Sequence, residues 1–353
     1  MVAVDDDRGV HSTLHTLRDA VADEIGWRWP AEPDGMATLH HYAMIPPGKL
    51  LRPVLLLCSA LASGGTLHPV VPAAVGFEAA HVGSLLHDDI IDQDGERRNR
   101  PAAHTVFGPA RTIIAGNALY FEWFAALTEC ARRGIPADRI AHAMRVQSAA
   151  GTRVCRGAYD EITLAGAIDS PLEDYLRMAE GKTAVLFEAA CRVGAVLAGA
   201  DRRTVEALGR FGHHLGMAFQ MRDDLLPYDA HPSTPSGKPQ ISDLRNRRPT
   251  LPILLAHRTA GPTDRETLRR TLLDTDDPSA ALTTMRALVT RLGALDMARD
   301  MVSREASRAC GALTRAAPGQ PAYTEVLLHT ARGLTDATHR ADATHQAEEG
   351  RRA

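Results

Sequence analysis

The chain has 353 residues, of which 44% are hydrophobic, and this is enough to build a substantial core. Its formal net charge of −3 argues against a nucleic-acid-binding protein that works through a broad basic surface. The five cysteines form no CxxC pair, no apolar run reaches the roughly 18 residues that cross a bilayer, and no signal-peptide pattern opens the chain. We therefore expect a cytoplasmic protein without disulfides, zinc or a transmembrane segment.

Apolar positions recur at helical spacing along almost the whole chain, and aromatic residues make up only 5%. This pattern predicts an all-α protein folded as a single large helical bundle, with no run of strands. No change in composition marks a boundary, so we expect one domain over residues 36–347, after an N-terminal helical segment (1–35) and before a polar tail (348–353). The expected helices span residues 11–25, 36–45, 50–63, 70–93, 109–133, 137–164, 172–199, 202–226, 251–260, 264–273, 278–315 and 321–347.

A first acidic cluster, HDDIID at residues 87–92, lies at the end of the helix predicted over 70–93. On a helix Asp88 and Asp92 share one face, and Asp89 lies about 100° round from them. A solvated acidic helix end is the alternative interpretation of such a motif. Here the acids follow small and apolar residues that look buried, and Mg²⁺ prefers hard oxygen ligands, so the cluster predicts a divalent-metal site.

A second pair of acids, Asp223 and Asp224, follows another apolar stretch that contains glycine and alanine. Two such helices, each ending in paired acids, predict a shared cavity in which both carboxylate sets face a polyphosphate through several metal ions.

Only three of the 40 lysine and arginine side chains are lysines, and each follows a glycine: Lys49, Lys182 and Lys238. Chance survival of three Gly-Lys pairs in an arginine-rich chain is one interpretation. The other is that these positions need a compact, strongly hydrated ammonium that a guanidinium cannot replace.

Six motifs in order, over about residues 46–260, resemble the polyprenyl synthetase family of trans-isoprenyl diphosphate synthases. They are GKLLRP (48–53), HDDIID (87–92), ERRNRPAAH (96–104), GKTA (181–184), FQMRDD (219–224) and GKP with the later DL and TLP (237–252). The resemblance implies an isoprenoid synthase fold of the class I terpenoid type, a helical bundle with a central active-site cavity. It also implies a Mg²⁺-dependent transferase that condenses isopentenyl diphosphate with an allylic diphosphate, and a homodimer.

The resemblance further implies roles for individual residues. Isopentenyl diphosphate would bind Gly48, Lys49, Arg52, His81 and Arg98. The phosphates of the allylic substrate would be neutralised by Arg97, Lys182 and Lys238, and held through three Mg²⁺ by Asp88, Asp92 and Asp223, with Asp89 and Asp224 in support. The Lys182 carbonyl, the Thr183 hydroxyl and the Gln220 amide would face the allylic cation.

Product length is predicted from the helix before HDDIID, because in the family the growing chain runs beside that helix. A bulky aromatic four or five positions before the first aspartate gives short products. Here Ser84 and Gly83 occupy those positions, Ala80 lies one turn further down, and Phe77 is the first bulky ring. We therefore expect a product of about twenty carbons or more.

The chain departs from the family pattern at four positions, where Leu50, Asn117, Ala158 and Pro227 replace the usual arginine, aspartate, glutamine and aspartate. Two alternatives follow. A class I terpene cyclase would ionise the same substrate alone, but the second acidic motif lacks the Ser or Thr of such cyclases. A weakly active partner subunit of a heteromeric synthase would explain the lost polar side chains.

Overall fold

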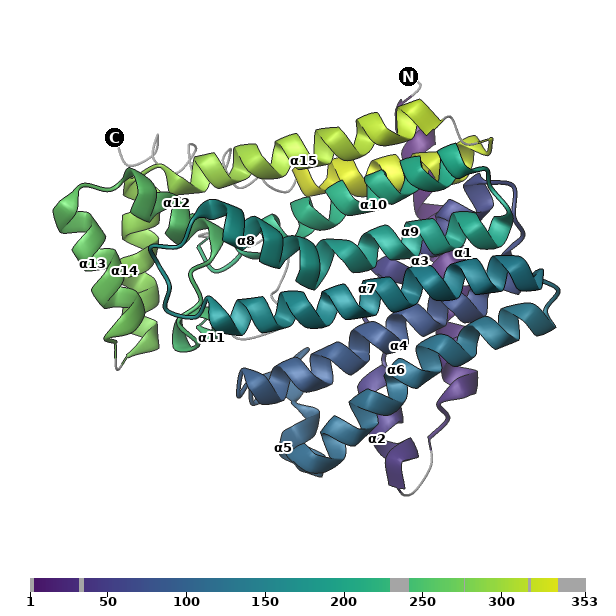
Figure 1. Ribbon diagram of the computed structural model, residues 1–353, viewed down its shortest axis with the longest axis horizontal. Coiled ribbons are helices and arrows are strands. Elements are labelled where there is room, and N and C mark those ends of the chain that lie inside the picture. The colour runs from purple at the N-terminus through teal and green to yellow at the C-terminus, as the bar shows by residue number, and fades with distance from the viewer. Residues whose placement is uncertain (1–2, 32–34, 229–240, 276, 317–318, 336–353) are drawn as a thin grey trace. The chain divides into compact units, whose positions relative to one another are not determined.

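The computed structural model describes residues 3–31, 35–228, 241–275, 277–316 and 319–335. These residues are almost entirely helical (Figure 1), so the prediction of an all-α protein is confirmed. The helices are α1 (Ala3–Arg28), α2 (Gly35–Met44), α3 (Leu51–Ala62), α4 (Leu67–Ile91), α5 (Ala103–Phe107), α6 (Pro109–Arg132), α7 (Ala137–Thr163), α8 (Leu172–Ala179), α9 (Val185–Ala198), α10 (Arg202–Asp223), α11 (Ser242–Arg245), α12 (Leu251–Thr259), α13 (Pro262–Leu273), α14 (Pro278–Arg291) and α15 (Ala294–Ala316). A further helical stretch covers 321–335.

The structure differs from the predicted elements in several places, and the sequence did not predict the short helices α5 and α11. A short antiparallel hairpin, β1 (Glu96–Arg97) and β2 (Arg100–Pro101), follows the first acidic cluster. The helix predicted over 172–199 contains a π-helical turn, η1 (Glu180–Ala184), between α8 and α9. The helix predicted over 278–315 is divided at Gly293, whose φ of 69° lies in the left-handed region that favours glycine.

The described chain divides into two compact units. Unit 1 contains the described residues within 3–151, 186–212 and 310–329, and unit 2 contains those within 152–185, 213–309 and 330–335. Helices α7, α10 and α15 contribute residues to both units. The domain boundaries predicted from the sequence stay predictions.

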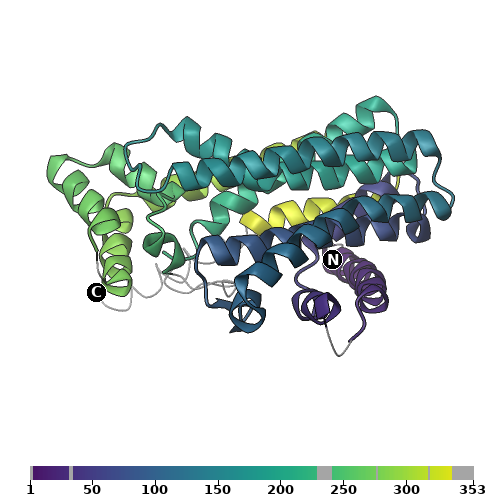
Figure 2. The same cartoon turned by 60° about the horizontal axis from the view of Figure 1, so that its bottom comes forward.

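In unit 1, α4 and α6 run side by side (Figures 1 and 2), and glycines on α4 allow the two helices to approach closely. A Cβ atom added at Gly83 would lie 2.9 Å from the Gly116 carbonyl oxygen, and one added at Gly76 would lie 2.8 Å from the Ala126 Cβ. The Phe77 ring meets the Trp123 ring edge to face at 5.2 Å. The two helices therefore pack closely along the segment that leads to the first acidic cluster.

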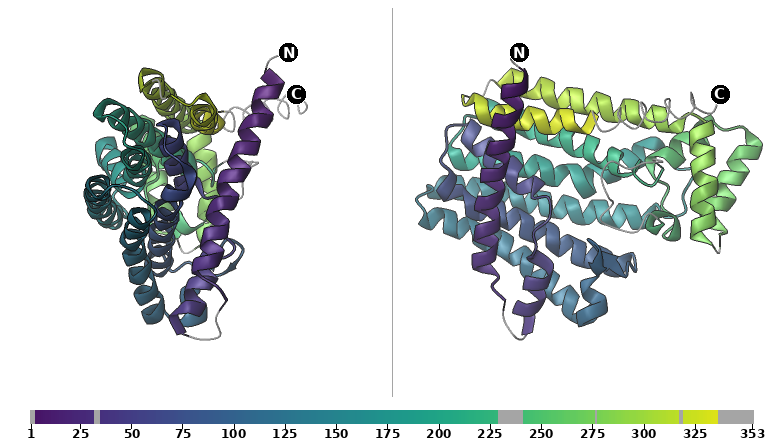
Figure 3. Two further views of the ribbon diagram at one scale, coloured as in Figure 1. Left: turned by 90° about the vertical axis from the view of Figure 1, so that its right-hand side faces the viewer. Right: turned by 180° about the vertical axis from the view of Figure 1, so that it is seen from behind.

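Helix α1 packs against α3 and α4 of the same unit and crosses them in the views of Figure 3. A buried ion-pair network joins its end to α6: Arg28 Nη1 donates to Glu129 Oε1 at 2.7 Å, and Arg133 Nη2 donates to Glu24 Oε1 at 2.8 Å. Each charge in this network has a partner, as partly buried charges require.

In unit 2, α13 and α14 lie side by side (Figure 1), and α12 contacts both of them and α8. The Asp264 and Arg291 side chains join α13 to α14 with an Nη2 to Oδ1 distance of 2.8 Å. His214 on α10 meets Glu305 on α15 at 2.7 Å. The second of these contacts joins α10, which ends at Asp223, to α15.

Among the described helices, α4 alone has the length and apolar composition to cross a membrane. However, 78% of its most apolar window is buried inside the structure, as is typical of a core helix.

Candidate active site

The first acidic cluster lies in the last turn of α4 and just beyond it. Asp89 and Asp92 are each only 3% exposed, whereas Asp88 is half-buried. Asp92 is the C-cap residue, and its N–H donates to the Asp88 carbonyl at 2.8 Å. The acids therefore occupy defined positions at a helix end and do not form a solvated acidic surface.

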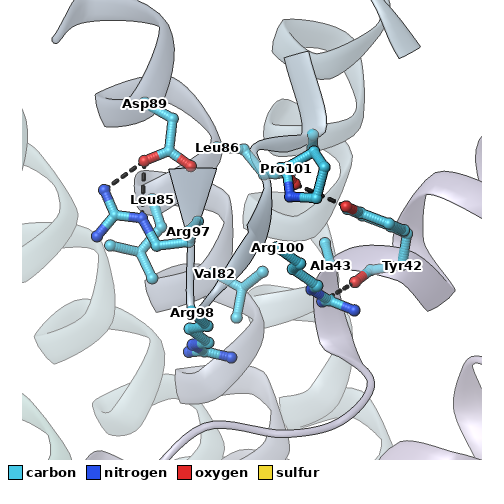
Figure 4. A pocket seen from close by; sticks show the side chains of 11 residues that line it. Tyr42, Ala43, Val82, Leu85, Leu86, Asp89, Arg97, Arg98, Arg100 and Pro101 are labelled. Atoms are coloured by element: carbon cyan, nitrogen blue, oxygen red, sulfur yellow. Dashed lines mark hydrogen bonds and ion pairs between the residues drawn. The ribbon is translucent and has the colours of Figure 1, made fainter. Parts of the chain in front are cut away.

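The hairpin that follows α4 brings Arg97 back onto Asp89 (Figure 4). Arg97 Nε donates to Asp89 Oδ1 at 2.8 Å, a second guanidinium N–H reaches the same oxygen, and Asp94 lies 3.8 Å away. Burial raises the pKa of Asp89, although the hydrogen bond from Arg97 opposes this. Burial disfavours the Arg97 charge, but Asp89 and the neighbouring acids raise its pKa overall.

Arg98 belongs to a different group of charges, and its side chain is separate from the Arg97–Asp89 pair in Figure 4. Its Nη2 lies 3.9 Å from Oε1 of Glu78, a carboxylate that is 2% exposed in the middle of α4. A Cβ at Gly48 would lie 2.5 Å from Arg98 Nη2, so the loop before α3 lies directly against this guanidinium. Burial lowers the pKa of Arg98 and raises that of Glu78.

Arg52 and His81 complete this group. The Arg52 guanidinium lies over the Phe187 ring at 4.7 Å. Burial and then the positive charges of Arg52, Arg98 and Arg97 lower the pKa of His81 well below its usual value. His81 is therefore neutral at physiological pH and can donate or accept one hydrogen bond at each ring nitrogen.

A small pocket of about 30 Å³ lies under the hairpin (Figure 4) and is lined on one side by Val82, Leu85 and Leu86 of α4. Arg100 closes it by donating from Nη1 to the Ile45 carbonyl at 3.1 Å and lying over the Tyr42 ring. These contacts hold the hairpin, and hence Arg97 and Arg98, against the rest of unit 1.

In unit 2, Lys182 lies in the π-helical turn η1. Its Nζ lies 2.5 Å from Glu161 Oε2, and Arg248 Nη2 lies 3.0 Å from the same oxygen. A Cβ at Gly157 would lie 2.1 Å from the Lys182 backbone nitrogen, so only glycine allows α7 to approach η1 this closely. Lys182 is thus positioned by its backbone and by a carboxylate together.

The next residue begins a chain of hydrogen bonds that runs through three side chains. Thr183 Oγ1 donates to Gln220 Oε1 at 2.6 Å, Gln220 Nε2 donates to Asp224 Oδ1 at 2.8 Å, and the Leu251 N–H donates to Asp224 Oδ2 at 3.0 Å. Thr183 and Asp224 are each 6% exposed. The chain links η1, α10 and the start of α12 within one unit.

Burial, followed by the negative charge of Asp243, raises the pKa of Asp224 to about 7 against the opposing effect of its N–H donors. Burial, followed by the negative charge of Asp224, raises the pKa of the Tyr175 hydroxyl, which lies beside this carboxyl group. Asp223, in contrast, is exposed at the end of α10.

Each unit thus gathers its own set of predicted residues. Unit 1 holds Gly48, Lys49, Arg52, His81, Asp88, Asp89, Asp92, Arg97 and Arg98, and unit 2 holds Lys182, Thr183, Gln220, Asp223 and Asp224. Lys238 lies outside the described residues. The roles that the resemblance gives to these side chains stay predictions.

Sequence reasoning missed three acids that contact predicted residues, Glu78, Asp94 and Glu161, and also missed Arg248, which pairs with Glu161. A lone carboxylate inside an otherwise apolar stretch of α4 signals Glu78, which is one helical turn before His81. Glu161 and Arg248 carry no such signal, because polar residues surround both of them in the sequence.

The residues assigned to product length are all on α4. Phe77 and Ala80 are buried, and Ser84 is half-buried with its hydroxyl donating to the His81 carbonyl at 2.7 Å. Gly83 is in contact with α6, as described above, so a larger side chain there would meet the Gly116 backbone. Their influence on product length stays a prediction.

The two acidic sets suit Mg²⁺ by the chemistry of their oxygen donors. Within the described residues no three acidic, histidine or cysteine side chains are arranged to hold a metal by themselves. Mg²⁺ commonly takes one or two carboxylates from a protein and completes its octahedron with phosphates and water.

Two of the departures from the family pattern have visible consequences. Leu50 is buried and has a φ of 53°, an unusual left-handed conformation for a leucine. Pro227 lies beyond the end of α10, which stops at Asp223 as the proline predicts, and its carbonyl accepts from Arg286 Nε at 2.6 Å.

Comparison with known proteins agrees with the family resemblance of the motifs. The sequence profile described as polyprenyl synthetase matches residues 34–288. A geranylfarnesyl diphosphate synthase from Aeropyrum pernix is 33% identical over 302 residues, which cover 84% of this chain and 92% of that relative. A (2E,6E)-farnesyl diphosphate synthase from Mycobacterium tuberculosis is 40% identical over 206 residues, or 58% of this chain, and the match spans only 56% of that relative.

Solved structures give the same result for the fold. The crystal structure of a polyprenyl synthase from Caulobacter crescentus CB15, complexed with calcium and isoprenyl diphosphate, has a TM-score of 0.83 at 28% identity and covers 94% of this chain and 97% of that one. A decaprenyl diphosphate synthase from Rhodobacter capsulatus has a TM-score of 0.81 at 30% identity, with 94% and 99% covered. The helical isoprenoid synthase fold predicted from the motifs is confirmed, and the chain belongs to the polyprenyl synthetase family.

Proposed function

We propose that the protein is a Mg²⁺-dependent chain-elongating prenyltransferase. It condenses isopentenyl diphosphate with an allylic diphosphate (dimethylallyl, geranyl, farnesyl or longer) and releases diphosphate. The product is a trans-polyprenyl diphosphate of about twenty carbons or more. Relatives named geranylgeranyl and geranylfarnesyl diphosphate synthase support this length, whereas the farnesyl diphosphate synthases among the relatives make shorter chains by name.

The observation that carries the proposal is the pairing of Lys182 with Thr183 in the single turn η1. Ionisation of an allylic diphosphate produces an anion and a cation together. The Lys182 ammonium suits the departing diphosphate, and the oxygen atoms of Thr183 and Gln220 suit the cation. Because hydroxyl and amide oxygens are weak nucleophiles, they stabilise the positive charge without being alkylated.

The proposed reaction has three steps. The allylic carbon–oxygen bond breaks, and its electron pair leaves with the diphosphate toward Lys182, Arg97 and Lys238. The double bond of isopentenyl diphosphate, held by Gly48, Lys49, Arg52, His81 and Arg98, then attacks the allylic cation. Loss of a proton to the released diphosphate completes the five-carbon extension.

Asp88, Asp92 and Asp223 would hold Mg²⁺, with Asp89 and Asp224 in support. The carboxylate oxygens of both acidic sets are the kind of ligand that this ion prefers. When bound, the ions supply positive charge that stabilises the departing diphosphate. Arg97 keeps Asp89 in place beside these ligands through the hydrogen bond at 2.8 Å.

We also propose a cytoplasmic homodimer. Exposed apolar side chains on α6, Ile114 at 62% and Phe121 at 75% exposure, provide apolar surface that a second copy would cover. Sedimentation equilibrium of the wild type and of Phe121→Glu tests this, since the substitution should shift the population toward monomer.

Incubation of the pure protein and Mg²⁺ with each allylic primer, with and without isopentenyl diphosphate, tests the activity. Longer diphosphates that form only with isopentenyl diphosphate are expected. Hydrocarbon formed without it would indicate a terpene cyclase, and no turnover with any primer would indicate a partner subunit.

A further inference from the structure

We propose that Asp224 is a positioning residue that fixes the amide orientation of Gln220, and that Asp223 alone of this pair ligates metal. The inference rests on the proposed function, because it concerns how the site receives an allylic cation. It gives Asp224 a different task from the supporting metal role that the motif suggests.

The orientation of the Gln220 amide follows from the donors and acceptors around it. Asp224 Oδ2 accepts the Leu251 N–H, and Asp224 Oδ1 accepts from Gln220 Nε2 at 2.8 Å. The Gln220 carbonyl must then lie on the other side, where it accepts from Thr183 Oγ1 at 2.6 Å. Thr183 has one proton, and once it is donated the hydroxyl oxygen has only lone pairs left.

Asp224 is itself fixed by backbone. Leu251 is the first residue of α12 and has no intrahelical acceptor for its N–H, as at every helix start. That N–H is donated to Asp224 Oδ2 at 3.0 Å in a buried position. The backbone therefore fixes the position of the Asp224 carboxyl group. This group fixes the orientation of the Gln220 amide, and the amide oxygen fixes the orientation of the Thr183 hydroxyl.

The orientation of the Gln220 amide decides whether its dipole stabilises or opposes the positive charge of the allylic cation. With this orientation the amide oxygen and the hydroxyl oxygen both present the negative ends of their dipoles, which stabilise positive charge. A reversed amide would present two N–H groups instead. Asp223 differs from its neighbour because it is exposed, while each Asp224 oxygen already accepts one N–H and the side chain is 6% exposed.

Asp224→Asn tests this with almost no change in shape. The new amide N–H₂ competes with Gln220 as a donor, so the Gln220 amide should reverse. The measurement is the ratio of dissociation constants, by calorimetry with Mg²⁺, for two non-reacting ligands: a diphosphate whose chain carries an ammonium in place of the allylic carbon, and its neutral isostere. Tyr175→Phe, which removes a hydroxyl beside the same carboxyl group, is the matched control.

We expect Asp224→Asn to lower the preference for the ammonium ligand about tenfold and to leave the half-saturating Mg²⁺ concentration within about twofold of the wild type. Asp223→Asn should raise that Mg²⁺ concentration, and Tyr175→Phe should change neither quantity. In the double variant Gln220→Glu with Asp224→Asn, the Asn N–H₂ again faces an acceptor, and the ammonium preference should recover.

An unchanged preference in Asp224→Asn would overturn the inference, as would a Mg²⁺ dependence shifted as far as that of Asp223→Asn. If Asp224→Asn does not fold, Gln220→Met replaces it: this variant removes the oriented oxygen, and an unchanged preference there also overturns the inference. Failure of the wild type to bind either diphosphate would instead reject the proposed function.

Discussion

Lys182 Nζ lies 2.5 Å from Oε2 of Glu161, and this carboxylate also accepts Arg248 at 3.0 Å. One acid therefore positions two cations within unit 2. The partly buried ion pair needs close geometry, because the cost of removing both charges from water is recovered only at short distance.

Substitution of lysine by arginine tests whether these positions need an ammonium. Lys182→Arg should lower kcat about tenfold or more, since the longer planar guanidinium cannot occupy the same place beside Glu161. Lys49→Arg and Lys238→Arg should also lower turnover. Steady-state kinetics with both substrates measures the effect, and unchanged turnover in all three variants would leave the scarcity of lysine without a functional reason.

Gly157→Ala should destabilise the protein by about 2 to 4 kcal/mol, because the added Cβ would meet the Lys182 backbone nitrogen at 2.1 Å. Gly151→Ala on the same helix is the control. Its Cβ would meet only Trp123 Cζ3 at 3.4 Å, so it should be neutral or stabilise by up to about 1 kcal/mol. Urea unfolding of both variants compares them, and equal stabilities would contradict the close approach of α7 to η1.

The lowered pKa of His81 gives a dependence of stability on pH. Its folded pKa is below the unfolded value of about 6.5, so its contribution is complete above pH 6.5 and is lost as the pH falls through that value. From pH 7.5 to 5.5 the loss should be on the order of 1 kcal/mol. The free energy of unfolding of His81→Gln should fall by about that much less over the same range, and equal losses would mean that His81 protonates in the folded protein.

Product length is better tested at Ser84 than at Gly83. A phenylalanine at Gly83 would meet the Gly116 backbone, so Gly83→Phe should lower the melting temperature by several degrees as well as any product length. Ser84 is half-buried, and its hydroxyl donates to the His81 carbonyl within α4. Ser84→Phe should shorten the main product by at least one isoprene unit, as chromatography of the dephosphorylated products would reveal. An unchanged distribution would remove Ser84 from the pocket.

The sequence predicted most helices because the apolar period is strong in long amphipathic segments such as α7 and α15, whereas α4 is a long stretch that is apolar on nearly every side. It did not predict the hairpin at Glu96–Pro101, since two-residue strands have no recognisable period. The π-helical turn at η1 was also missed, because it depends on tertiary contacts such as that between Gly157 and Lys182.

The candidate site, like the fold, could be predicted where the signal is local in the sequence and could not be predicted where it depends on tertiary contacts. Aspartates in apolar surroundings and lysines after glycine could be singled out by residue type alone. Glu161 could not, because its importance comes from contacts with Lys182 and Arg248 that are 21 and 87 positions away in the chain. The direction of the Thr183–Gln220 hydrogen bond likewise depends on Asp224 and on the start of α12.

The stoichiometry of diphosphate release tests the proposed chain elongation most directly. The wild-type protein is incubated with Mg²⁺, geranyl diphosphate and isopentenyl diphosphate, and both the isopentenyl diphosphate consumed and the diphosphate released are measured. The proposal predicts one diphosphate released for each isopentenyl diphosphate consumed, and none in its absence. Release at the same rate without isopentenyl diphosphate would contradict it.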